Sequence, residues 1–343
     1  MTPKEVIFTA FDFHKPPRIP VALFGGGMFT MYNTGNSFKS LAEDAKGMAN
    51  MIISFSKRSF SDIVYVGSGY NNFHASALGG KIRYREIGAP DLEEPLVNTE
   101  SDLDKLDLER LKDNATVSAI WEATEMVSRA IGDEFVVTAT AWGPFTLGAQ
   151  MFGVEKMMRG TFKSPELAKK IVDFAANLNI EFYSHLADKG IIKMICLADP
   201  TASGDLISRK QFENFALPYL QKVTSWAKIK GVKVLVHICG DTSDRLDLFP
   251  KMGADCISLD HKVDIARAKS ELLGKICFAG NVNPVSVLNN GTPSEVEEMT
   301  RRCIETAGLE GGFVLMPGCD IPPTVPIKNV ETFVNIAREW KLN

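Results

Sequence analysis

Short apolar runs recur along this chain and alternate with longer segments in which apolar residues return every third or fourth position. Eight of these runs predict strands, at residues 19–24, 62–67, 135–142, 191–197, 233–240, 254–261, 275–282 and 311–318. The intervening spacing predicts helices; in residues 38–60, for example, Leu41, Ala45 and Met48 fall on one helical face. The order is therefore strand, helix, strand, repeated along most of the chain.

The apolar character of the runs indicates how these strands pack. Each run is too apolar for either face to contact water, which is typical of parallel strands covered on both sides. Eight such strands alternating with helices predict an α/β fold of the (β/α)8 TIM-barrel type, in a single domain over residues 1–343. Residues 68–114 break the pattern, and we interpret them as an excursion after the second strand. The alternative is a doubly wound open sheet, but the glycines at 25–27 lack the spacing of a dinucleotide fingerprint.

Residues whose side chains can bind metals or transfer protons lie at the ends of the predicted strands. In a (β/α)8 barrel, active-site groups lie at the carboxyl ends of the strands, so these positions are the candidates for a site. They are Asp199, His237, Cys239, Asp260, His261, Asn281, Asn283, Cys319 and Asp320. Asp199 and Asp260 have the alternative role of binding loop amides.

The stretch KVLVHICG, at the end of the fifth predicted strand, carries the strongest metal signal. His237 and Cys239 are two residues apart, so on a strand their side chains point the same way. Cys319 ends the eighth predicted strand and supplies a third ligand if the two strand ends meet. Two Cys and one His from a rigid scaffold match a catalytic zinc site that keeps one position open. Taken singly, each of the three also fits a packed or hydrogen-bonded residue.

Composition excludes some classes of function. The chain has 343 residues, 45% of them hydrophobic, and a formal net charge of −4, which argues against nucleic acid or an anionic membrane as the main partner. No signal-like start and no membrane-length apolar stretch stands out, and the six cysteines lack paired spacing. We therefore expect a cytoplasmic protein, in which Cys196, Cys256, Cys277 and Cys303 fill the core and His14, His74 and His185 lie at surface or structural positions.

Three segments carry a family resemblance: AWGPFTLGAQMFG, ADCISLDHKVDIARAKSELLGKICFAGNVNP and GGFVLMPGCDIPPTVPIKNVETFV. They resemble the uroporphyrinogen decarboxylase superfamily, whose fold is a (β/α)8 barrel. The chain departs from the decarboxylases at the points that matter for decarboxylation. FGGGMFTMY lacks the substrate-binding arginine, VGSGYNN lacks the aspartate, Gln150 stands where a tyrosine is expected, and Cys319 replaces the histidine of the last loop.

Where it departs from the decarboxylases, the chain resembles the zinc methyltransferase branch of the superfamily. The metal motif of that branch is His-x-Cys and a late Cys. The resemblance implies that His237, Cys239 and Cys319 bind Zn²⁺, and that a methyl group moves between a corrinoid (methylcobalamin) carried by a partner corrinoid protein and a zinc-activated thiol such as coenzyme M or homocysteine. Asp199 and Asp260 are the expected catalytic carboxylates. We expect Asn281 and Gln150 to contact the cofactor.

Other functions remain open at this stage. The same ligands suit a methyltransferase that passes a methyl group from a methylated substrate, such as a methoxy compound or a methylamine, to a corrinoid protein. A non-catalytic tetrapyrrole-binding barrel and a decarboxylase are further alternatives. The chain has no corrinoid-binding motif of its own, so the corrinoid comes from a partner or is free.

Overall fold

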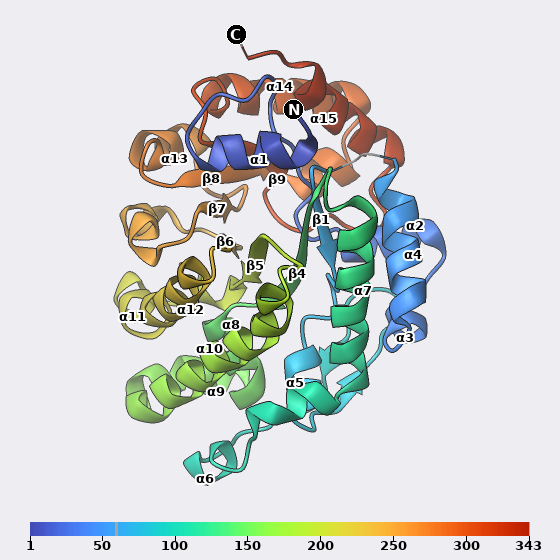
Figure 1. Ribbon diagram of the computed structural model, residues 1–343. Coiled ribbons are helices and arrows are strands. Elements are labelled where there is room, and N and C mark those ends of the chain that lie inside the picture. The colour runs from blue at the N-terminus through green and yellow to red at the C-terminus, as the bar shows by residue number, and fades with distance from the viewer. Residues whose placement is uncertain (59–60, 343) are drawn as a thin grey trace.

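The computed structural model describes residues 1–58 and 61–342, and a curled sheet of seven parallel strands lies at its centre (Figure 1). Neighbouring strands in space follow one another along the chain. They are β1 (Ile63–Val66), β4 (Val136–Trp142), β5 (Met194–Ala198), β6 (Lys233–Ile238), β7 (Cys256–Leu259), β8 (Cys277–Val282) and β9 (Phe313–Pro317). The predicted α/β class and the parallel pairing are confirmed.

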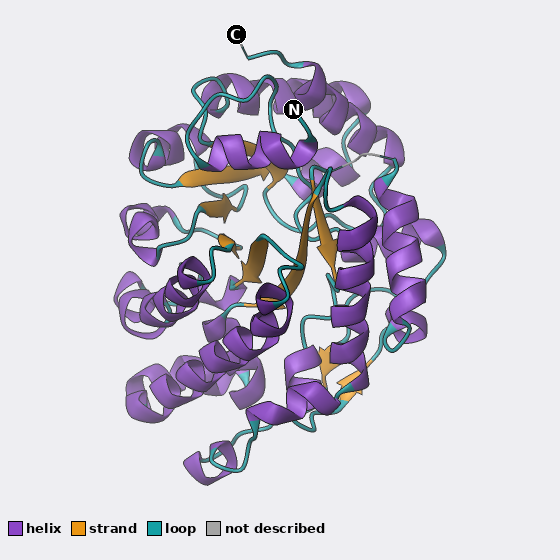
Figure 2. Ribbon diagram, in the orientation of Figure 1, coloured by secondary structure: helices purple, strands orange, loops and turns teal. Residues whose placement is uncertain are grey.

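Helices surround this sheet, so that the strands form the inner layer and the helices the outer one (Figure 2). The α-helices are α1 (Pro3–Phe11), α2 (Gly27–Thr34), α3 (Phe38–Leu41), α4 (Ala45–Ser56), α5 (Phe73–Ala77), α6 (Glu100–Leu103), α7 (Ala115–Ile131), α8 (Pro144–Phe152), α9 (Val154–Lys163), α10 (Pro165–Asp188), α11 (Arg209–Phe215), α12 (Leu217–Ile229), α13 (Ile265–Leu272), α14 (Pro293–Ala307) and α15 (Ile327–Glu339). The 3₁₀-helices are η1 (Leu108–Asp113), η2 (Pro200–Ala202) and η3 (Ser243–Met252), and η4 (Pro284–Asn289) is a π-helix. Among the described residues, no helix is long and apolar enough to cross a membrane.

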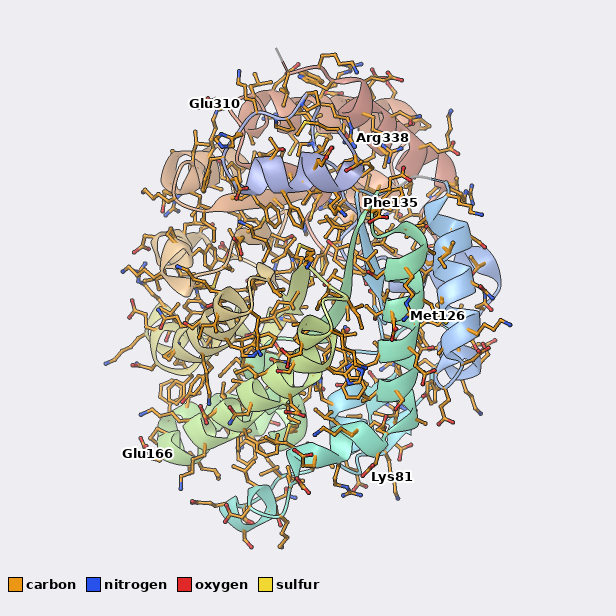
Figure 3. The ribbon with its side chains drawn as sticks, in the orientation of Figure 1. Lys81, Met126, Phe135, Glu166, Glu310 and Arg338 are labelled. Atoms are coloured by element: carbon orange, nitrogen blue, oxygen red, sulfur yellow. The ribbon has the colours of Figure 1, made fainter. Side chains whose placement is uncertain are left out.

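Alternate strand residues face two different cores. In β5, Cys196 belongs to the inner core enclosed by the sheet, whereas Ile195 and Leu197 belong to the outer core between sheet and helices. The inner core mixes alanine and cysteine with larger side chains, and α1 contributes Ile7 and Phe11 to it. Side chains fill the space between sheet and helices (Figure 3). Both faces of the sheet are therefore buried, which explains why the strands read as continuous apolar runs.

Two breaks between consecutive helices lie just before prolines. One lies at Ser164, where α9 ends at Lys163 and α10 begins at Pro165. The other lies at Ala216, where α11 and α12 meet two residues before Pro218. A proline is tolerated in the first turn of a helix, where its missing N–H has no helical partner.

The first predicted strand is corrected by the structure. Residues 19–24 belong to no strand, and a single isolated parallel bridge joins Val21 to Leu315. Two backbone N–H groups are missing from the β-ladder here. Pro20 has no N–H, and the N–H of Val21 donates to Asp62 Oδ2 at 2.9 Å. The N–H of Asp62 donates to the Val21 carbonyl at 2.8 Å, so the segment still lies between β9 and β1.

Two further predictions concern the segments that flank β1. Within residues 38–60, the structure has α3 and α4 in place of one helix, and positions 59–60 lie outside the described residues. Between β1 and β4 the chain forms α5, α6, η1 and a two-stranded antiparallel sheet of β2 (Ile82–Arg83) and β3 (Asp91–Leu92). No strand of the parallel sheet lies between β1 and β4, so this segment leaves the strand and helix alternation.

Candidate metal centre

Three predicted ligands from two distant parts of the chain meet at one end of the sheet. His237 is in β6, Cys239 follows that strand, and Cys319 follows β9. His237 Nε2 lies 2.8 Å from Cys239 Sγ, and Cys239 Sγ lies 2.8 Å from Cys319 Sγ. The three ligand atoms lie within 4.8 Å of one another, so a single metal ion can contact all of them. This is the one such group found among the described residues.

The His237 ring is held by two neighbours. Its Nδ1 lies 3.0 Å from Ser258 Oγ, and both residues are fully buried. The Phe24 ring packs against it at a centroid distance of 4.1 Å. When Nδ1 donates a hydrogen bond to the serine hydroxyl, Nε2 carries no proton and faces the two sulfur atoms, which is the tautomer that a metal requires.

A hydrogen bond joins the two thiols. The hydrogen bond between them lowers the pKa of the Cys319 thiol, although burial acts in the opposite direction. The same contact raises the pKa of the Cys239 thiol, and burial raises it further. The lowered pKa favours the thiolate of Cys319, and a thiolate is the form in which cysteine binds a metal.

Asp260 holds the backbone beside Cys239. Its carboxylate accepts hydrogen bonds from the N–H groups of Gly240 at 2.8 Å and Lys262 at 3.0 Å, and it lies 2.8 Å from His261 Nδ1. Gly240 has φ +83°, a conformation that residues with a side chain rarely adopt. The carboxylate thus fixes the turn that directs the Cys239 side chain.

Asp199 is completely buried at the end of β5 and supports α8. It accepts a hydrogen bond from the N–H of Thr146 at 2.6 Å, and burial raises the pKa of its carboxyl to about 6. Gln150 lies partly buried in the same helix. Both carboxylates predicted as catalytic thus contact loop or helix amides, the alternative noted from the sequence. Their catalytic role stays a prediction, as does the contact between Gln150 and a cofactor.

Asn281 supports a loop next to β8. Its Nδ2 donates to the carbonyls of Asp260 at 3.0 Å and Val263 at 2.7 Å, so both of its amide hydrogens are used within the chain. Contact with a cofactor through this side chain would involve its oxygen atom. The predicted cofactor role of Asn281 is untested.

Asp320, next to Cys319, joins the metal loop to the segment after residue 24. The N–H of Gly26 donates to its Oδ1 at 2.8 Å. Burial raises the pKa of the Asp320 carboxyl to about 7, although the Gly26 hydrogen bond acts in the opposite direction. Because Gly26 also has positive φ, this loop contact depends on a backbone that glycine allows.

The sequence assigned no role to Ser258 or Phe24. A signal for Ser258 was present, since it alternates with Cys256 and Asp260 and therefore shares their face of the strand. Its pairing with His237 needed the strand register, which the structure gives as His237 opposite Ser258. Phe24 reaches His237 from a segment more than two hundred residues earlier in the chain, and no local pattern predicts that contact.

Ser258→Ala is expected to weaken metal binding without unfolding the protein. Loss of a partner that orients a metal-bound histidine costs about 10-fold to 100-fold in metal affinity. Competition with a chromophoric zinc chelator measures the dissociation constant directly. Ser258→Thr, which keeps the hydroxyl, is the matched control and should retain most of the affinity. Equal affinity in wild type and Ser258→Ala would show that this hydroxyl does not orient His237.

Comparison with known proteins identifies the family of this chain. The model of the uroporphyrinogen decarboxylase (URO-D) family matches residues 2–340. The chain therefore belongs to the uroporphyrinogen decarboxylase family, as its sequence resemblance predicted.

Relatives within this family include methyltransferases. The chain is 32% identical over 239 residues to the methylcobamide:CoM methyltransferase MtbA of Methanosarcina acetivorans, covering 68% of each protein. It is 29% identical over 349 residues to MtbA of Methanosarcina mazei, covering 99% of this chain and 98% of that protein. A solved methyltransferase from Methanosarcina mazei has the same fold, with a TM-score of 0.87, 22% identity and 99% coverage of both chains. The chain is thus an enzyme of the methyltransferase type within its family.

Proposed function

We propose that this protein is a zinc-dependent methyltransferase that moves a methyl group between a protein-bound corrinoid and a small thiol. The observation that carries the proposal is the convergence of His237 Nε2 with the Cys239 and Cys319 sulfur atoms. One imidazole nitrogen and two thiols are soft ligands of the kind zinc prefers, and three protein ligands leave a position for substrate. Similarity to relatives named methylcobamide:CoM methyltransferases supports the choice of reaction.

The donor set fits zinc in its surroundings as well as in its composition. A hydrogen bond from His237 Nδ1 to Ser258 would leave Nε2 free for the metal, and the lowered pKa of Cys319 favours its thiolate. Zinc held by these residues would lower the pKa of a bound substrate thiol, so that the thiolate forms at neutral pH.

The chain's own residues position the reacting groups. Asp260 holds the turn after Cys239, and Asp320 ties the loop after Cys319 to Gly26. Phe24 covers one face of the His237 ring. We assign Asp260 and Asp199 as positioning residues, because each carboxylate accepts hydrogen bonds from backbone amides beside the site. Preorganised ligands of this kind avoid the cost of ordering the site when substrate binds.

The transfer balances without any further redox partner. The carbon–cobalt bond of a methyl-Co(III) corrinoid breaks, both bonding electrons stay on cobalt as Co(I), and a carbon–sulfur bond forms. The thiol proton passes to solvent. The chain offers no corrinoid-binding motif of its own, so we propose that a partner corrinoid protein presents the cofactor to the end of the sheet that carries the ligands.

We also propose that the whole chain is one (β/α)8 barrel domain. Residues 20–23 lie hydrogen-bonded between β9 and β1, where an eighth strand would close the ring. Val21 pairs with Leu315 on one side, and its carbonyl accepts from Asp62 on the other. Closure at this point brings Phe24 into the same site as the ligands from β6 and β9.

The test combines metal analysis with a spectroscopic assay. Purified protein should contain about one zinc per chain, and addition of a thiol should convert methylcobalamin to cob(I)alamin. The thiols used are 2-mercaptoethanesulfonate, homocysteine and 1-propanethiol. Absence of zinc would refute the metal centre. Zinc without turnover by any thiol would favour transfer from a methylated substrate to the corrinoid.

A further inference from the structure

The loop after β5 lies against the turn that follows the predicted metal ligand Cys239. We call residues 199–207 the β5 loop. The N–H of Gly204 donates to the Asp241 carbonyl at 2.8 Å, and Asp205 Oδ2 accepts a longer hydrogen bond of 3.4 Å from the N–H of Asp241. A Cβ atom at Gly204 would lie 2.5 Å from the Asp241 carbonyl oxygen, so the two backbones are in close contact. A shift of the β5 loop is therefore transmitted to the turn.

Gly240, the residue after Cys239, is held from two sides. On the side of the β5 loop, a Cβ atom at Gly240 would lie 2.5 Å from Asp205 Oδ2 and 3.0 Å from Ser203 Oγ. In addition, the N–H of Gly240 donates to Asp260 Oδ2 at 2.8 Å. The backbone next to the ligand is thus held between the β5 loop and the carboxylate of Asp260.

Arg245, in η3, anchors the β5 loop at two points. Its Nη1 donates to the Ala202 carbonyl at 2.9 Å, and its Nη2 donates to the Ile207 carbonyl at 2.8 Å. These two carbonyls flank residues 203–206, the part of the loop that contacts the turn. A guanidinium presents its donors in a rigid planar arrangement, so one Arg245 side chain fixes both ends of this segment.

The burial of Arg245 indicates a role beyond filling space. The side chain is fully buried, and its charge is paired with Asp244 through Nε at 2.7 Å and Nη2 at 3.1 Å. Burying a charge is costly even when it is paired, and well-packed apolar residues often replace buried ion pairs without loss of stability. Stability alone therefore gives little reason for an arginine here, whereas the two carbonyl contacts do.

A second link to the β5 loop is weaker. Asp205 Oδ2 lies 2.7 Å from Lys262 Nζ, which joins the loop to the segment after β7. The two side chains are 40% and 50% exposed, and exposed ion pairs contribute little because water and salt screen them. Arg245 is therefore the main side-chain anchor of the loop.

We infer that Arg245 and Gly204 are positioning residues of the metal centre, which hold Cys239 in place through the β5 loop and the turn at Gly240–Asp241. The inference rests on the proposed function for the metal ion, and it does not depend on the direction of methyl transfer or on the substrate. Residues that orient metal ligands typically contribute about 10-fold to 100-fold to metal affinity.

Gly204→Ala is expected to weaken zinc binding by about 10-fold or more, because its methyl group needs the space of the Asp241 carbonyl oxygen. Gly204 is not among the glycines with positive φ, so the effect comes from this contact and not from backbone strain. Competition with a chromophoric chelator measures the zinc dissociation constant. Leu206→Ala is the matched control, since Leu206 is in the same loop and exposed, and it should bind zinc as wild type does. Equal affinity in Gly204→Ala and Leu206→Ala would overturn the inference.

Arg245→Met is expected to weaken zinc binding by a similar factor, because methionine cannot donate to Ala202 or Ile207. Arg245→Lys, which keeps the charge but not the planar fork, should give an intermediate dissociation constant. Urea denaturation of the zinc-free proteins measures stability separately. A loss of stability with unchanged zinc affinity would show that Arg245 is structural only. If Arg245→Met does not fold, the result for Gly204→Ala decides.

Cobalt(II) in place of zinc gives a spectroscopic readout of the same displacement. Its visible bands depend on the coordination geometry and on the sulfur ligands, so they should change in Gly204→Ala and stay as in wild type in Leu206→Ala. If wild type binds neither metal, the proposed metal centre is wrong. If wild type binds both metals and Gly204→Ala gives the same spectrum and affinity, only the positioning role is wrong.

Discussion

Cys319→Ala is expected to lose zinc and methyl transfer together. This variant removes one of three protein ligands and leaves His237 and Cys239, a set that holds zinc weakly. Because the substrate thiol would then ionise with its ordinary pKa, we expect kcat/KM to fall by about 1,000-fold or more. Cys239→Ala should behave in the same way, since its sulfur lies between the other two ligand atoms.

Metal analysis and the methylcobalamin assay on the same preparations measure both effects. Cys303→Ala is the matched control, because Cys303 is a buried cysteine in α14 whose Sγ contacts the Gly280 carbonyl, away from the ligand group. The control should retain zinc and activity. If Cys319→Ala kept full zinc content and full activity, the proposed metal centre would be wrong.

Acidification is expected to destabilise the protein through His74. This histidine in α5 is fully buried, stacks on Phe73 at 4.1 Å, and has no hydrogen-bond partner for either ring nitrogen among the described residues. Burial lowers the pKa of His74 to about 3. The unfolded chain, with a histidine pKa of about 6.5, therefore takes up the proton first as the pH falls.

This difference in pKa determines how the free energy of unfolding changes with pH. A lowered pKa in the folded state gives a contribution that is fully present above about pH 6.5 and is lost as the pH falls towards about 3. Between about pH 7.5 and about pH 5, the free energy of unfolding should drop by about 2 kcal/mol because of this residue alone.

His74→Leu should remove that drop, and urea denaturation at both pH values measures it. The exposed His14 provides the control, and His14→Leu should keep the drop seen in wild type. Asp199 acts in the opposite direction, since its raised pKa makes its contribution decrease as the pH rises through about 6. Comparison of each variant with wild type cancels the Asp199 effect. An unchanged drop in His74→Leu would show that His74 is protonated without unfolding.

Sequence patterns located most of the sheet because burial on both faces leaves a strong local signal. Seven of the eight apolar runs became strands of one parallel sheet. The strand prediction for residues 19–24 was wrong because the pattern reflects apolar character and not the availability of hydrogen-bond donors. The Asp62 carboxylate accepts a hydrogen bond from the N–H of Val21, and the two residues are forty-one positions apart. A local pattern contains no information about such a competitor.

The sequence by itself determined the alternation of strand and helix, the family, and the three residues with metal-binding chemistry. Each of these depends on residue type and short-range spacing. The tertiary structure alone decided that Cys319 reaches Cys239 and that Ser258 lies beside His237. Those contacts depend on strand register and on how the sheet curls, which set distances between residues far apart in the chain.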